Sequence, residues 1–128
     1  MNIRFPFREV EPFTITTDGS GDGNATTTDL LRGALWGYVV DFGTAGASTV
    51  LTGYVVGGAA DDTDLLVFTS AAGNTDGIRH PRLISVLASD GTAGTGELFP
   101  AIPGRKFKVV AASAGGIATI TIKLIVIQ

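Results

Sequence analysis

The stretch Ile117-Ala-Thr-Ile-Thr-Ile-Lys-Leu-Ile-Val-Ile-Gln128 decides the fold class, because most of it alternates between apolar and polar residues. One face would carry Ala118, Ile120, Ile122, Leu124 and Val126, and the other Thr119, Thr121 and Lys123. A period of two is typical of a half-buried β-strand. Ile125 and Ile127 break the alternation, so both faces are apolar at this end. We therefore expect a further surface, such as a partner chain, to cover it.

The residues just before this stretch predict a strand that turns back on it. Phe107 and Val109 alternate with Lys106 and Lys108. Ala114-Gly-Gly116 then supplies residues that tolerate positive φ, so the chain can reverse. We predict that residues 105–128 form a β-hairpin.

Further short strands with turn residues between them are predicted along the rest of the chain. They cover residues 13–17, 25–29, 34–42, 49–56, 64–70 and 83–88. Gly37 indicates a bulge, and Leu65-Leu-Val-Phe68, apolar on both faces, indicates a central strand. Two prolines in residues 98–103 indicate an edge segment, and residues 30–32 could form one helical turn. With no long amphipathic helix, the pattern predicts an all-β fold, either an antiparallel β-sandwich or a jelly-roll-like barrel.

Residues 1–12 are expected to form an extended N-terminal arm on a single β-sandwich domain of residues 13–128. Pro6 and Pro12 exclude a central strand. Ile3, Phe5 and Phe7 would share one face of the arm. That face could lie on the edge of the domain itself or on a neighbouring subunit.

Composition narrows the functional classes. The chain has no cysteine, its charged fraction is 16%, and its net charge is −3. This excludes disulfides and thiolate chemistry and gives no case for nucleic-acid binding. No apolar run approaches the length of a membrane span, so we expect no membrane partner. The first ten residues lack the apolar core of a signal peptide, so we expect synthesis in the cytoplasm, followed by solubility or assembly.

One loop has the spacing of a calcium site. The oxygen-bearing residues are Asp18, Ser20, Asp22, Asn24 and Asp29, with Gly23 where such a loop turns most tightly. The flanks are Thr-rich and strand-like rather than helical, so a hairpin turn held by Asp and Asn side chains is the alternative. We expect no bound cofactor.

No recognisable catalyst is present, so we expect a protein that is not an enzyme. His80 is the only histidine, no G-x-S-x-G elbow accompanies it, and there is no cysteine to complete a zinc site. We interpret it as an exposed loop residue, and Arg79 and Arg82 as partners for a neighbour's carboxylates.

Two further clusters allow both structural and functional interpretations. Asp61, Asp62 and Asp64 could act as paired carboxylates, but a solvated turn fits them better. Trp36 and Tyr38 share one side of their strand if no bulge intervenes, and an exposed aromatic pair could bind sugar, although a core position is commoner.

Several turn and strand motifs together resemble small structural proteins encoded beside the capsid genes of tailed bacteriophages. They are Thr14-Ile-Thr-Thr-Asp-Gly-Ser-Gly-Asp22, Leu35-Trp-Gly-Tyr38, Pro81-Arg82, and Pro103-Gly-Arg-Lys-Phe-Lys-Val109 followed by Gly115-Gly116. The resemblance covers most of the chain from Phe13 on. The Phe-Pro-Phe arm and the apolar ending depart from it.

This resemblance implies a virion protein, made in the host cytoplasm, that decorates or cements the capsid surface. Its partners would be the major capsid protein and itself, as a homotrimer. The residues expected at these contacts are Ile3, Phe5, Phe7, Arg79, Arg82, Ile125 and Ile127. The alternatives are a phage tail or fibre component, or a free calcium- or sugar-binding β-module.

Overall fold

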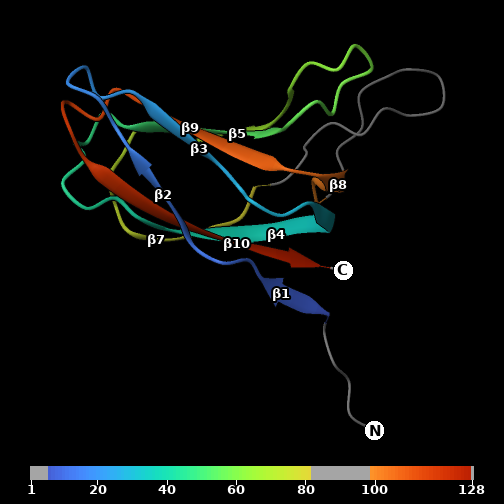
Figure 1. Cartoon of the computed structure of the whole chain (residues 1–128). Coiled ribbons are helices and arrows are strands. Elements are labelled where there is room, and N and C mark those ends of the chain that lie inside the picture. Colours follow the sequence, from blue (N-terminus) through green and yellow to red (C-terminus); the bar gives the residue numbers. More distant parts are fainter. Residues whose placement is uncertain (1–5, 82–98, 128) are drawn as a thin grey trace, which may run out of the picture.

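Two antiparallel β-sheets packed face to face make up the part of the chain that the structure describes, residues 6–81 and 99–127 of a computed structural model (Figure 1). In chain order the strands are β1 (Phe7–Glu9), β2 (Phe13–Thr16), β3 (Gly23–Thr26), β4 (Leu31–Asp41), β5 (Val50–Val55), β6 (Leu65–Thr69), β7 (Gly77–Arg79), β8 (Ala101–Arg105), β9 (Phe107–Ala112) and β10 (Thr119–Ile127). The predicted all-β sandwich is confirmed. Within the described ranges there is no helix long and apolar enough to cross a membrane.

The six-stranded sheet is built on its two long strands, β4 and β10. They pair antiparallel, from Thr121 opposite Asp41 to Ile127 opposite Ala34. The far edge of β10 is shared by β1 and β2, and the far edge of β4 by β7 and β8. Four short segments therefore flank the two long strands.

The four-stranded sheet has the order β3-β9-β5-β6 and covers the other side of the core. Alternation in β9 and β5 turns every second residue inward, because strand side chains point to opposite faces in turn. The fully buried side chains between the sheets include Ile15, Leu31, Leu35, Tyr38, Val40, Leu51, Val55, Ile102, Phe107, Ile120, Ile122 and Leu124. The inward face predicted for β10 is thus confirmed.

The predicted hairpin over residues 105–128 is wrong, because its two arms lie in different sheets. Strand β9 pairs with β3 and β5, whereas β10 pairs with β1, β2 and β4. The reversal lies at the predicted place, with φ of 61° at Ser113, 83° at Gly115 and 150° at Gly116. It carries the chain across the core instead of to an adjacent strand. Alternation reveals which side chains point inward, and this holds equally for an arch and for a hairpin.

Strand β6 corrects a second prediction. Among the described strands it lies at the edge of its sheet, bonded to β5 alone, rather than at the centre. Leu65 and Leu66 are 45% and 55% exposed. An apolar run on both faces suggested cover on both sides, but no other described segment covers the outer side of Leu65 and Leu66.

Smaller differences concern element boundaries. Leu31 and Arg32 belong to strand β4, not to a helical turn. The returning strand β3 begins at Gly23, earlier than the predicted residue 25. The strand predicted over residues 83–88 lies outside the described residues.

The arm ends in a true edge strand. Strand β1 follows Pro6 and pairs with the end of β10, with Phe7 opposite Ile127 and Glu9 opposite Ile125. Val10 is buried and donates its N–H to the Leu124 carbonyl at 2.9 Å. This part of the arm therefore lies on the domain's own edge, one of the two predicted alternatives.

Buried polar side chains among the described residues are all threonines, and each is hydrogen-bonded. Thr17 Oγ1 donates to the Gly116 carbonyl at 2.7 Å and accepts the Ala118 N–H at 2.8 Å. Thr27 Oγ1 accepts the Phe107 N–H at 3.0 Å. These bonds fasten the β2 and β3 ends to segments more than 75 residues away in sequence.

Candidate functional site

A bulge in β4 separates its two large aromatic residues. The pairing with β10 shifts between Ile125 and Val126, opposite Gly37 and Leu35, so Trp36 falls at the bulge. The bulge predicted at Gly37 is confirmed. Because it shifts the alternation, Tyr38 points into the core while Trp36 is half-buried, so the aromatic pair considered from the sequence does not form.

Trp36 takes part in an aromatic row instead. Its ring meets Phe7 edge-on, with centroids 5.2 Å apart, and His80 edge-on at 4.6 Å. His80 Nδ1 lies 3.3 Å from the Trp36 carbonyl oxygen. His80 is exposed, as predicted, and this row ties β1, β4 and the end of β7 together.

Tyr38 stacks across the sandwich on Phe68 of β6, with centroids 4.7 Å apart and ring planes 16° apart. The Phe68 ring lies over Gly53 of β5, where an added Cβ would stand 2.2 Å from its Cε1 atom. Gly53 is therefore the residue that lets Phe68 lie flat between the sheets. The stack joins the two sheets on the side where β6 and β7 lie.

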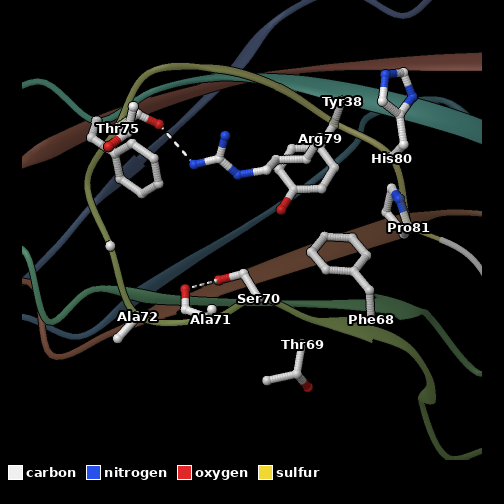
Figure 2. Close-up of a pocket in the computed structure, with 12 residues that line it drawn as sticks. Tyr38, Phe68, Thr69, Ser70, Ala71, Ala72, Thr75, Arg79, His80 and Pro81 are labelled. Carbon is white, nitrogen blue, oxygen red and sulfur yellow. Dashed lines mark hydrogen bonds between the residues drawn. The ribbon is translucent and has the colours of Figure 1, made fainter.

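A cavity of about 390 Å³ opens beside this stack, and we call it the edge pocket. It is lined by Tyr38, Phe42, Phe68, Thr69, Ser70, Ala71, Ala72, Gly73, Thr75, Arg79, His80 and Pro81. In Figure 2 the Arg79 side chain spans the upper wall, Phe68 and Ser70 form the lower wall, and the Tyr38 hydroxyl projects between them. The volume lies within the range of small-ligand sites, roughly 300–1,000 Å³.

The loop that forms one wall, residues 70–76, is held at several points. Ser70 Oγ accepts the Leu51 N–H at 2.9 Å and donates to the Ala71 carbonyl at 3.0 Å. Asn74 Nδ2 donates to the Ala45 carbonyl, and Asp76 Oδ1 accepts the Phe42 N–H at 2.8 Å. The wall is therefore fixed to β5 and to the segment that follows β4 before any ligand arrives, which lowers the ordering cost of binding.

The Tyr38 hydroxyl and the Arg79 guanidinium both have hydrogen-bond donors that bond to no other described residue. Tyr38 is 2% exposed, yet its hydroxyl makes no hydrogen bond to any other described residue. Burial raises its pKa to about 12, and nearby Arg79 opposes part of that rise. Arg79 Nη2 donates to the Thr75 carbonyl at 2.8 Å, and no carboxylate among the described residues pairs with Arg79.

The structure disperses most residues that the sequence analysis expected at partner contacts. Arg79 lines the edge pocket, and Phe7, 45% exposed, lies opposite Ile127 and packs on Trp36 of β4. Ile125 is buried within the single chain, with only 8% of its surface exposed, so it needs no partner chain to cover it. Ile3, Phe5 and Arg82 lie outside the described residues.

The calcium-like loop folds as the alternative turn. Asp18 Oδ1 accepts the N–H groups of Ser20 and Asp22, and Asp22 Oδ1 accepts the Ser113 N–H at 3.3 Å. Asn24 lies on β3 and Asp29 beyond it, where its carbonyl accepts a bond from Thr27. Within residues 6–81 and 99–127 no three His, Cys, Asp or Glu side chains gather as a metal site would need.

The acidic cluster also separates. Asp61 binds the backbone N–H and hydroxyl of Thr63, which lowers the pKa of its carboxyl. Asp64 pairs with Lys108 and accepts the Gly57 N–H at 3.1 Å, and these contacts lower the pKa of Asp64. Each serves its own turn, as the solvated-turn interpretation predicts.

Sequence reasoning missed Phe68, Thr69 and Ser70 as site residues. They were assigned to a central strand, where they would have been covered. The one sequence signal was Gly53, a glycine inside a strand, which often marks a close approach by another group.

Comparison with known proteins gives similarities of chain path only. No protein-family model matches, and no curated protein matches. Two solved structures are carbohydrate-binding modules. "CBM32 of AlyQ in complex with 4,5-unsaturated mannuronic acid" is 14% identical over 87% of this chain and 75% of its own, with a TM-score of 0.47. Chitosan-binding module 1 from a chitosanase/glucanase of Paenibacillus sp. IK-5 is 11% identical over 87% and 74%, also with a TM-score of 0.47.

A third similar structure is a much larger enzyme. The serine protease of Aeromonas sobria is 6% identical over 98% of this chain and only 28% of its own, with a TM-score of 0.44. The assignment of this chain as a β-sandwich rests on its own strand pairing.

Proposed function

We propose that this chain is a non-catalytic sugar-binding β-sandwich, and that the edge pocket is its binding site. The observation that carries the proposal is the Tyr38 hydroxyl, which faces the cavity and bonds to no other described residue, although the rest of the side chain is buried. A hydroxyl that faces a cavity can donate to a ligand hydroxyl, and such a hydrogen bond is worth about 0.5–1.5 kcal/mol.

The rest of the wall suits a saccharide. Thr69 and Ser70 add hydroxyls, Arg79 adds donors, and the edge of the Tyr38–Phe68 stack adds an apolar surface. Sugar rings present both hydroxyls and apolar C–H faces, so a mixed wall of this kind complements them. The described lining residues contain no pair of carboxylates, the groups with which most glycosidases cleave, so we propose binding rather than hydrolysis.

The test is a titration with soluble mono- and oligosaccharides, followed by two-dimensional NMR of the labelled protein. Binding should shift the signals of residues 68–73 and Arg79, and it should raise the melting temperature by mass action. Tyr38→Phe should weaken binding about two- to tenfold, the worth of one hydrogen bond. Tyr54→Phe is the matched control, because Tyr54 lies on β5 outside the pocket, beneath the Lys108 ammonium. The proposal would be refuted if binding shifted signals elsewhere in the protein, or if Tyr38→Phe and Tyr54→Phe weakened the affinity equally.

A second candidate is a virion protein that decorates or cements a tailed-phage capsid, bound to the major capsid protein as a homotrimer. The observation in its favour is exposed apolar surface on strands at the sheet margins. These side chains are Phe7 on β1, Leu65 and Leu66 on β6, and Ile78 on β7. Large apolar side chains on sheet edges invite contact with other chains.

Light scattering of the purified protein tests the self-association. A mass near three times 13.1 kDa for the wild-type protein would support this candidate, provided that the Leu66→Lys variant has the mass of a single chain. A monomer at all concentrations would remove the trimer. Gold-labelled antibody on virions then separates a capsid location from a tail or fibre location.

A further inference from the structure

The charge of the edge pocket is opposite to that of the whole chain. The protein carries a net charge of −3, with 12 acidic residues. The described pocket lining nevertheless contains Arg79 and His80 and no Asp or Glu. A cation on a pocket wall without a carboxylate beside it selects for anionic ligands.

Two lysines outside the pocket, unlike Arg79, form ion pairs with carboxylates. Lys108 binds Asp64, and Lys123 Nζ lies 3.5 Å from Glu9 Oε2. Asp76, the acid nearest to Arg79 in sequence on the 70–76 loop, accepts the Phe42 N–H and forms no ion pair with Arg79. The carboxylate of this loop is therefore engaged by the backbone and does not neutralise Arg79.

Within residues 6–81 and 99–127, the Arg79 guanidinium is held at one nitrogen only. One terminal nitrogen, Nη2, is anchored by the Thr75 carbonyl at 2.8 Å, and Figure 2 shows the guanidinium lying along the pocket wall. A guanidinium has five N–H donors, and the one anchor is the only side-chain bond that Arg79 makes to another described residue. Anchored and planar, it can take a carboxylate through two parallel hydrogen bonds.

We propose that the ligand of the edge pocket is an acidic saccharide, a uronic-acid unit whose carboxylate pairs with Arg79 while its ring hydroxyls bond to Tyr38 and Ser70. This rests on the proposed sugar-binding function and names the class of sugar. The ring itself lies against the Tyr38–Phe68 stack.

The experiment compares matched ligands by calorimetry: oligogalacturonides against galacto-oligosaccharides of the same length, which differ in the carboxylate. The acidic series should bind at least about tenfold more tightly, as charge-assisted hydrogen bonds require. Arg79→Gln should remove that difference and leave the weak neutral binding. Arg8→Gln, the same charge change on exposed strand β1, should keep the difference.

The outcomes separate this inference from the function beneath it. Equal binding of both series, unaffected by Arg79→Gln, overturns the acidic ligand and keeps a sugar site. Binding of neither series overturns both. Tighter binding of a peptide rich in Asp and Glu than of the uronides also overturns the inference, because the carboxylate would then come from a protein. Circular dichroism melting of both variants establishes that they are folded at the titration temperature.

Discussion

Replacing Gly53 by alanine tests whether the Tyr38–Phe68 stack depends on a missing side chain. An ideal Cβ at position 53 would lie 2.2 Å from Phe68 Cε1, 2.7 Å from Cδ1 and 2.8 Å from Cζ. Carbon atoms in contact normally stand about 3.5–4.0 Å apart. The Phe68 ring must therefore retreat by more than about 1 Å, and the stacked Tyr38 ring, with its centroid 4.7 Å away, opposes that movement.

The expected cost follows from these distances. Overpacking a core costs about 1–3 kcal/mol. Alanine also restricts the unfolded chain, which returns about 0.4–1 kcal/mol. The net loss should be about 1–2 kcal/mol, which for a domain of this size lowers the melting temperature by roughly 4–8 °C.

Thermal unfolding followed by circular dichroism measures this change, with Gly19→Ala as the matched control. Gly19 has nothing within 4 Å of its added Cβ and no positive φ, so that variant should be neutral or slightly more stable. In the double variant Gly53→Ala/Phe68→Leu, the ring that clashes is gone. Its loss should be smaller than the sum of the two single losses by at least about 0.5 kcal/mol. A Gly53→Ala protein that melts like Gly19→Ala, or additive losses in the double variant, would refute the proposed packing.

Three further outcomes are expected. Thr27→Val should lower the free energy of unfolding by about 1–3 kcal/mol in urea titrations, because the buried Phe107 N–H loses its acceptor, whereas Thr26→Val on the exposed side of β3 should change it little. The contacts of Asp64, chiefly with Lys108, lower its pKa below the ordinary 3.8, so the stability that Asp64 contributes should be complete above pH 3.8 and lost as pH falls through the lowered pKa. Lys108→Met should reduce this loss of stability in acid, measured by urea unfolding at a series of pH values. An unchanged loss would contradict the pairing. The pKa of Tyr38 is raised from 10.0 to about 12, so its burial should stabilise the fold below pH 10 and lose that effect between pH 10 and 12; ultraviolet titration should show a phenolate step near pH 12 that Tyr38→Phe removes.

The sequence was informative where the answer depended on one strand alone. The buried face of β10, the inward residues of β4 and the bulge at Gly37 all follow from local alternation. The turns at residues 18–24 and 114–116 follow from residues that bind their own backbone or accept positive φ.

The sequence was misleading where the answer depended on which strands become neighbours. Alternation in β9 and β10 fits a hairpin and an arch equally well, and only cross-sheet packing chooses the arch. The apolar run in β6 suggested two covered faces, yet Leu66 is mostly exposed. The edge pocket could not be predicted, because one wall comes from β4 and the other from the β6–β7 segment, which lies more than 20 residues further along the chain.

The central position of β10 has a consequence for the order of folding. Strands β1, β2 and β4 all pair with β10, and the bond from the Ala118 N–H to Thr17 Oγ1 joins residues 101 apart. During translation these earlier strands leave the ribosome long before their common partner does. The edges of these strands that pair with β10 stay unpaired until β10 has been synthesised. Such long-range pairing slows folding and exposes the nascent chain to aggregation. Closure of the larger sheet is therefore a late, cooperative event, and a chain that stops before β10 has no centre on which to assemble it.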